Sequence, residues 1–195
     1  MSELLALAGF SFISAITPGP NNVMLWASGV QFGLRRTIPH VLGIGVGVGS
    51  MALLVAAGLG VLITTVPTLE VVLRVIGSLY LLYLAYQIVG GADTVAREAT
   101  APLTLWQALV FQYVNPKAWV FVLAAVTTFR PEGLSVALGT ALMALTMMVV
   151  VVPCATVWAA AGGILSKYLA DQGGSRWFRV AMGVLLAATV VYIWI

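Results

Sequence analysis

Long apolar runs alternate with short polar segments along almost the whole chain. Six of the runs have about the length of 20 residues that a helix needs to cross a bilayer. Their approximate bounds are Leu4–Ser28, Ile38–Ile63, Leu69–Val89, Leu105–Thr128, Leu134–Ala161 and Phe178–Ile195. The pattern predicts an all-α integral membrane protein with six transmembrane helices, forming one transmembrane domain over residues 1–195.

Composition agrees with this interpretation. Hydrophobic residues make up 62% of the chain and charged residues 8%, whereas soluble domains carry roughly 25% charged residues. The single cysteine (Cys154) excludes an internal disulfide, and with the single histidine (His40) leaves no cluster for a metal ion. The basic residues form no patch with interleaved aromatic residues, so we expect no nucleic-acid partner.

The loop charges predict an orientation. Excess Lys and Arg marks the cytoplasmic side of a membrane protein. The loops after the first, third and fifth runs hold six such residues, and the opposite side holds two; they are Arg35, Arg36, Arg97, Lys167, Arg176 and Arg179 against Arg74 and Arg130. Both termini are therefore predicted to be periplasmic. Glu3 precedes the first run at the place where a signal peptide has its basic n-region, so we expect a retained helix and not a cleaved signal peptide.

The two halves of the chain resemble each other. The first run contains "FISAITPGPNNVMLW" and the fourth "LVFQYVNPKAWVFVL"; the third contains "LRVIGSLYLLYLAYQI" and the sixth "FRVAMGVLLAATVVYI". A three-helix unit that is repeated once must insert in opposite orientations, as in many secondary transporters. We therefore predict inverted repeats over about 1–91 and 103–195. Chance similarity between apolar segments is the alternative.

Two prolines interrupt the first run near its middle. Proline has no N–H, and its ring clashes with the carbonyl four residues earlier. Pro18 and Pro20 are thus expected to free the carbonyls of Ser14 and Ile16, with Gly19 allowing the chain to turn. Unsatisfied carbonyls are tolerated at this depth only where they face protein or a water-filled cavity.

Polar residues accompany this break and its counterpart in the fourth run. Asn21 and Asn22 follow the first break at the start of a half-helix, whose positive dipole end suits a carboxylate. In the fourth run, Pro116 is expected to free the carbonyl of Gln112. Asn115 and Lys117 flank that proline.

Lys117 lies near the centre of a run of about 24 residues, too far from either end for its side chain to reach the interface. Such a position costs about 2.5–3.5 kcal/mol even on insertion scales. Freed carbonyls, water, an anionic ligand or loss of the proton must compensate. The alternatives are that the prolines only shape kinks, that the asparagines join helices, and that Lys117 pins a loop. The candidate substrate-binding residues are Thr17, Pro18, Gly19, Pro20, Asn21, Asn22, Asn115, Pro116 and Lys117.

Two further observations limit the function. The segment "GIGVGVGS" at 43–50 predicts a close helix-packing surface, which also permits a homodimer. The chain has no nucleophile–base set, no carboxylate pair within a run and no phosphate-binding Gly-rich loop. We therefore expect no enzyme and no cofactor, and transport energised by an ion or solute gradient.

The motifs resemble those of the LysE/RhtB family of bacterial amino-acid exporters. "TPGPNN" at 17–22, "VNPKAW" at 114–119, and the segments 73–89 and 176–189 match that family in order. "GLRR" and "FQYVN" are most similar to the cysteine/O-acetylserine exporters within it. The resemblance implies export of amino acids or close derivatives across the bacterial inner membrane, driven by the proton gradient. Lys117 is the candidate for the residue that couples proton movement to substrate transport. A passive channel and a non-transporting scaffold are the rival functions.

Overall fold

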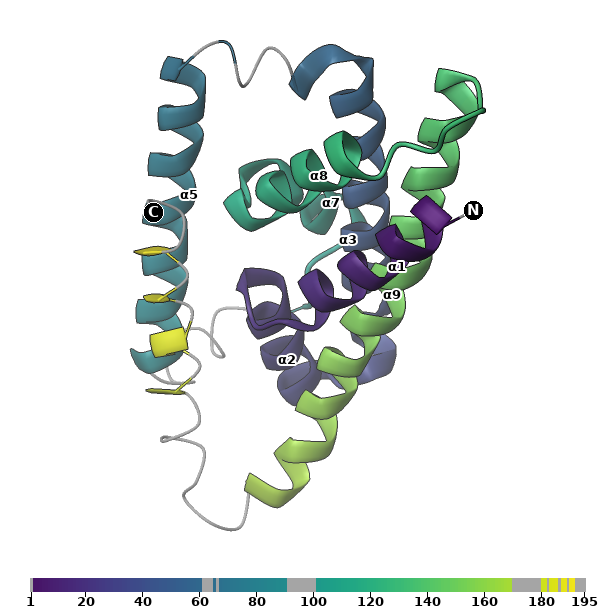
Figure 1. The fold of residues 1–195 in the computed structure, drawn as a ribbon. Coiled ribbons are helices and arrows are strands. Elements are labelled where there is room, and N and C mark those ends of the chain that lie inside the picture. The colour runs from purple at the N-terminus through teal and green to yellow at the C-terminus, as the bar shows by residue number, and fades with distance from the viewer. Residues whose placement is uncertain are drawn as a thin grey trace.

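The structure is a computed structural model that describes residues 2–60, 65, 67–90 and 101–169, and residues 180, 181, 183–185, 187, 188, 190 and 191. Over these residues the regular structure is helical, with no strand (Figure 1). The elements are α1 (Ser2–Ile16), α2 (Pro20–Phe32), α3 (Leu34–Leu54), the π-helical turn η1 (Val55–Leu59), α5 (Pro67–Gly90), α7 (Leu105–Val114), α8 (Pro116–Thr128) and α9 (Val136–Leu169).

The predicted breaks of the first and fourth apolar runs are confirmed. Helices α1 and α2 meet at a bend of 59°, and α7 and α8 meet at a bend of 76°. Each second half begins with proline at its first position, after Gly19 or Asn115 at the N-cap. Proline is favoured there because the first N–H of a helix lacks an intrahelical partner in any case. The bends therefore lie where the prolines predict them.

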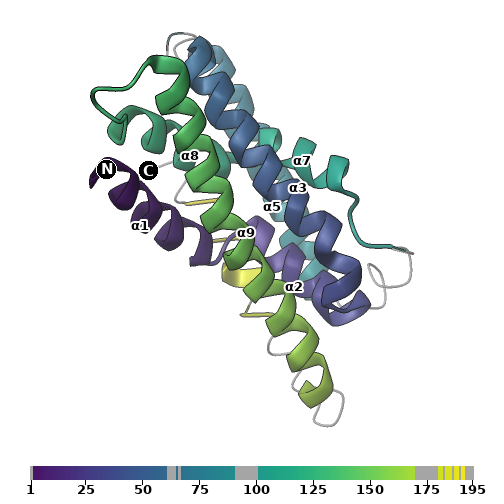
Figure 2. The ribbon, with the colours of Figure 1, turned by 90° about the vertical axis from the view of Figure 1, so that its right-hand side faces the viewer.

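Helices α3 and α9 form the long antiparallel pair around which the bent helices lie (Figure 2). The backbone of α3 comes so close to α9 that a Cβ on Gly45 would stand 2.5 Å from a Val152 methyl group, and one on Gly49 would stand 2.6 Å from the sulfur of Met148. Gly43 and Gly47 face α7 in the same way. The predicted glycine packing surface of the second run is thus confirmed.

The number of spans is confirmed only in part. By length and composition, two helical stretches among the described residues can cross a membrane, Leu34–Leu59 and Val136–Ile164. They become four spans if each bent pair is counted as one. Helix α5 adds a long helix at the predicted position of the third run. Of the 18 residues of the sixth predicted run, 178–195, the structure describes only nine, so six spans remain a prediction.

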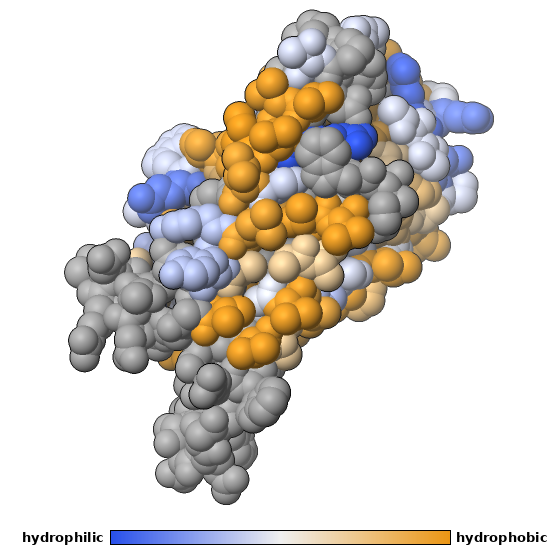
Figure 3. Space-filling model, turned by 90° about the vertical axis from the view of Figure 1, so that its left-hand side faces the viewer, coloured by the Kyte–Doolittle hydropathy of each residue, from blue (hydrophilic) through white to orange (hydrophobic). Residues whose placement is uncertain are grey.

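Large apolar side chains cover much of the outer surface, as Figure 3 shows for one face. Among them are Leu5, Leu79 and Trp106, which are 76%, 63% and 71% exposed. Contiguous apolar surface of this kind marks an interaction site in a soluble protein. Here it matches the apolar spans and suits contact with lipid.

Candidate functional site

The break in the first run is closed by its own asparagine. Helix α1 ends at Ile16, and the Asn22 side chain turns back from α2 to donate from Nδ2 to the carbonyls of Ala15 at 2.9 Å and Thr17 at 2.7 Å. Asn22 is 6% exposed. The structure therefore gives this side chain a role in satisfying the carbonyls that the bend opens.

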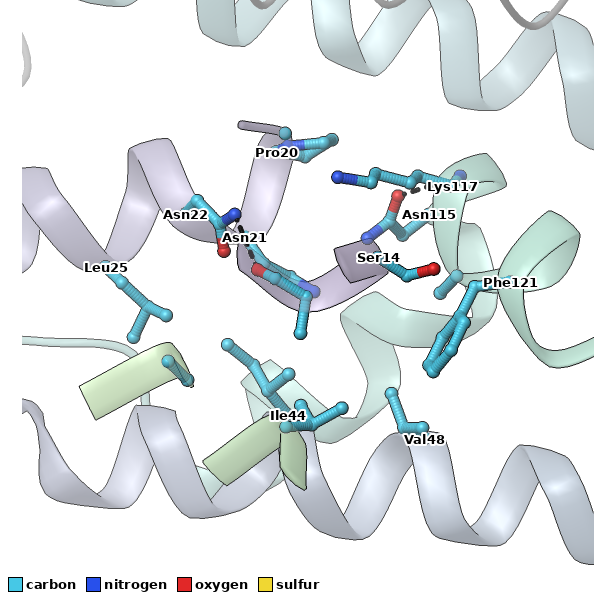
Figure 4. A pocket seen from close by; sticks show the side chains of 15 residues that line it. Ser14, Pro20, Asn21, Asn22, Leu25, Ile44, Val48, Asn115, Lys117 and Phe121 are labelled. Atoms are coloured by element: carbon cyan, nitrogen blue, oxygen red, sulfur yellow. Dashed lines mark hydrogen bonds between the residues drawn. The ribbon is translucent and has the colours of Figure 1, made fainter. Parts of the chain in front are cut away.

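Lys117 joins the two breaks. Its Nζ donates to the carbonyl of Thr17 at 2.7 Å and to that of Pro18 at 3.2 Å, in the linker between α1 and α2. Figure 4 shows the Lys117 side chain extending from α8 toward Pro20 at the start of α2. The open backbone at Gly19 makes room for it, because a Cβ there would stand 2.8 Å from Cδ and 3.0 Å from Nζ of Lys117. A lysine in the middle of an apolar run was expected to need freed carbonyls, water, an anionic ligand or loss of its proton. The structure shows carbonyls that accept from its Nζ.

The carbonyls that Lys117 and Asn22 use are not the two expected from the first proline pair. Pro18 and Pro20 pointed to Ser14 and Ile16, four residues earlier. The bonded oxygens belong to Ala15, Thr17 and Pro18, because α1 ends before the prolines and the extended linker turns its own carbonyls inward.

The expectation for Gln112 is wrong. Its carbonyl accepts the N–H of Asn115 at 3.2 Å, because the last turn of α7 tightens to three residues and consumes the oxygen that Pro116 leaves. The Gln112 side chain, which the sequence did not single out, is fully buried and pairs with Asn21. Asn21 Nδ2 donates to Gln112 Oε1 at 2.8 Å, and Gln112 Nε2 donates to Asn21 Oδ1 at 3.2 Å.

The second break has its own cap. Asn115 is 2% exposed, and its Oδ1 accepts the backbone N–H of Lys117 at 3.1 Å. Pro116 faces α5, where a Cβ on Gly77 would stand 2.7 Å from the proline Cδ. Helix α5 thus braces the bend from which Lys117 projects.

A pocket of about 500 Å³, including its open part, lies between the two breaks. Its polar wall consists of Ser14, Gly19, Pro20, Asn21, Asn22, Asn115 and Lys117. Its apolar wall consists of Ala15, Leu25, Ile44, Val48, Ala118, Phe121, Val151 and Ala155 (Figure 4). Six of the nine predicted site residues line it.

The other three predicted residues support the pocket from behind. Thr17 and Pro18 provide the carbonyls that hold Lys117, and Pro116 contacts α5. The sequence missed the apolar wall, to which α1, α2, α3, α8 and α9 all contribute. An apolar residue in a membrane helix gives no sign of whether it faces lipid, a neighbouring helix or a cavity.

The wall chemistry suits a small zwitterion. Backbone carbonyls attract an ammonium group, as the bound Lys117 shows, and the N-terminal end of α2 favours a carboxylate. The apolar wall suits an uncharged side chain. Among the residues described, no group of three or more His, Cys, Asp or Glu side chains is placed to hold a metal ion.

Comparison with known proteins places this geometry in a family. The chain matches the LysE type translocator family over residues 12–195. It belongs to that family. The resemblance inferred from the proline motifs is thus confirmed, and the LysE-type match extends through both breaks and the pocket between them.

Three relatives of this LysE-type chain share one name. The cysteine/O-acetylserine efflux protein of Klebsiella pneumoniae is 33% identical over 124 residues, which make up 64% of this chain and 63% of that protein. Proteins of the same name from Escherichia coli O1:K1 and Salmonella typhi are each 25% identical over 97% of this chain and over 96% and 94% of their own lengths. No solved structure matches the chain.

Proposed function

We propose that this LysE-type protein is a secondary transporter of the bacterial inner membrane that exports amino acids or close derivatives by proton antiport. The observation that carries the proposal is the pocket between the two breaks, where the Lys117 ammonium occupies backbone carbonyls beside an apolar wall. The family and the efflux function named for its relatives support export.

In this proposal, Lys117 stands in for the amino group of the substrate. The two carbonyls that it occupies, of Thr17 and Pro18, are the acceptors that a substrate ammonium requires. The substrate carboxylate then meets the start of α2 at Asn21, and the side chain meets Leu25, Ile44 and the rest of the apolar wall. The uncharged wall favours small, neutral side chains, in keeping with the cysteine and O-acetylserine in the relatives' names.

Proton coupling follows from the shared acceptors. When Lys117 is protonated, its ammonium holds the carbonyls of Thr17 and Pro18 and excludes the substrate ammonium. When it loses its proton, the acceptors become free for substrate. Proton and substrate therefore exclude each other in the site, which is the requirement for antiport.

Inverted three-helix repeats over about 1–91 and 103–195 complete the proposed architecture. The packing supports it: the bent pair of the first half, α1 and α2, lies on α9 of the second half, and α7 with α8 lies on α3 of the first. The excess of Lys and Arg in the odd-numbered loops supports periplasmic termini.

Efflux from proteoliposomes tests the proposal. Vesicles loaded with labelled cysteine, O-acetylserine and a panel of other amino acids are assayed with and without a pH gradient. We expect Lys117→Gln to abolish the stimulation by the gradient, and Arg130→Gln, which removes an exposed charge outside the pocket, to leave it unchanged. Unchanged coupled efflux in Lys117→Gln would refute the role of Lys117.

Counterflow separates a carrier from a passive pore. Unlabelled substrate on the far side should accelerate uptake of labelled substrate through a carrier and not through a channel. Absence of counterflow, together with gradient-independent efflux, would replace the exporter proposal with a facilitator. Absence of any flux, with Pro18, Pro20 and Lys117 replaceable by apolar residues, would favour a scaffold.

A further inference from the structure

A buried polar layer, made up of Ser28, Thr37 and His40, lies within the apolar bundle outside the pocket. Ser28 Oγ and Thr37 Oγ1 are 2.8 Å apart and hydrogen-bonded. His40 is 1% exposed, and neither of its ring nitrogens has a hydrogen-bond partner. Buried polar groups are nearly always bonded, and an ionisable side chain within a membrane helix is by default a candidate functional group.

This layer adjoins the pocket on one side. His40 precedes Ile44 by four residues on α3, and Ser28 follows Leu25 by three residues on α2, and both Ile44 and Leu25 line the pocket. Residues at these spacings lie on the same face of a helix, about one turn or 5.4 Å apart along its axis. The polar layer is therefore the next layer of side chains after the pocket wall.

On its other side, the layer leads to the connection between α2 and α3. Arg35 and Arg36 are exposed at the start of α3, one turn or slightly more before His40. The charge distribution predicts that this connection faces the cytoplasm. His40 thus lies between the substrate pocket and the side of the membrane on which an antiporter must release its proton.

Few ionisable groups face this layer. Of the elements that contact α3 most extensively, α2 and η1 carry no ionisable side chain, α7 carries Tyr113, and α8 carries Lys117. Helix α9 carries Cys154, Lys167 and Tyr168. Tyr113 is engaged with Ser50 at 2.8 Å. No carboxylate lies in these elements, so a protonated imidazole there would have no anionic partner among their described residues, which favours passing a proton on over storing it.

We propose that His40 relays to the cytoplasmic side the proton that Lys117 releases; this inference rests on the proposed antiport. A neutral imidazole has one N–H and one free lone pair, so it can accept a proton at one nitrogen. The proton passes from Lys117 Nζ through water in the pocket to a His40 ring nitrogen, and then from the imidazolium to cytoplasmic water. Lys117 is left neutral, and the two carbonyls are open to the substrate.

The test compares two fluxes in the same proteoliposomes with O-acetylserine as the probe. Net efflux driven by a pH gradient requires proton transfer, whereas counterflow exchanges substrate for substrate with no net proton movement. We expect His40→Gln to lower net driven efflux by at least about tenfold, in line with the effect of removing a proton-transfer group. Counterflow should stay close to the wild-type rate. Ser28→Ala, which removes a neighbouring hydroxyl that is not a proton carrier, is the matched control and should retain both fluxes.

Each other outcome overturns the relay. Equal driven efflux in His40→Gln and wild type shows that the proton takes another route. Loss of both fluxes in His40→Gln and in the smaller His40→Asn shows that the residue is structural. Wild-type protein with counterflow and no response to the pH gradient refutes proton antiport itself, and the relay with it.

Discussion

Gly19→Ala is the substitution that most directly tests how Lys117 is held. The new methyl group would stand 2.8 Å from Cδ and 3.0 Å from Nζ of Lys117, inside the 3.4 Å at which ordinary contacts begin. The Gly19 backbone, with φ −176° and ψ −177°, is extended and accepts alanine without strain. The perturbation therefore acts on the lysine and not on the local fold.

Displacement of Lys117 weakens its bonds to the carbonyls of Thr17 and Pro18, which measure 2.7 Å and 3.2 Å. A hydrogen bond to a charged group contributes about 1.5–3 kcal/mol. Loss of one of the two bonds corresponds to a change of roughly 10- to 150-fold in the equilibrium constant for holding Lys117 in place, because each 1.4 kcal/mol is a factor of ten. We expect gradient-driven efflux to fall by about this factor, because a displaced lysine no longer excludes substrate in step with its proton.

A second background isolates the cause. In Lys117→Ala the three nearest atoms to the new methyl group are gone, so Gly19→Ala should add little to the defect of Lys117→Ala alone. Gly9→Ala, where a Cβ meets nothing within 4 Å, controls for an added methyl group. Both efflux and counterflow are measured in proteoliposomes. If Gly19→Ala lowers transport by the same factor in the wild type and in Lys117→Ala, the reasoning is refuted, because the methyl group would then act on the substrate or the backbone and not on Lys117.

Three further experiments test the packing around the site. Asn21→Leu and Gln112→Leu should show a coupling energy of about 0.6–1.7 kcal/mol in a double-mutant cycle of unfolding in detergent, as expected for hydrogen bonds between membrane helices; additive losses would argue against the pair. Gly77→Val should lower the thermal unfolding midpoint and driven efflux together, since overpacking against the Pro116 ring costs about 1–3 kcal/mol; an unchanged midpoint would contradict the brace. Gly47→Leu should destabilise the fold by a similar amount, because the new side chain would overlap that of Gln112. The matched control Gly9→Leu should not destabilise it, and equal thermal unfolding midpoints for the two variants would disprove the close contact.

Local chemistry is what the sequence predicted best. Pro20 and Pro116 start the second half-helices because proline is preformed for the first helical position and cannot continue a helix. The apolar runs around them follow from residue hydropathy alone. The cost of a lysine in the middle of an apolar run also follows from sequence, and it pointed to Lys117 as a residue that needs acceptors.

The partners of those residues depended on tertiary structure. Asn22 lines the pocket and also bonds the carbonyls of Ala15 and Thr17. The sequence did not predict these two bonds, because the direction of the side chain depends on the 59° bend between α1 and α2. Nothing in the sequence indicated that Gln112 would pair with Asn21, because the two residues are 91 positions apart and only the fold brings α7 and α2 within hydrogen-bonding distance.

The apolar wall shows the limit most clearly. Ile44 and Val48 line the pocket, while Leu42 and Val46, on the same helix, are 42% and 37% exposed. All four are apolar residues of the same run, and hydropathy treats lipid, protein core and cavity alike. The sequence by itself determined that the chain belongs in a membrane, where its helices break and that Lys117 needs acceptors. Which carbonyls accept it and which apolar residues face the pocket were decided by helix packing, because only packing tells one apolar surface from another.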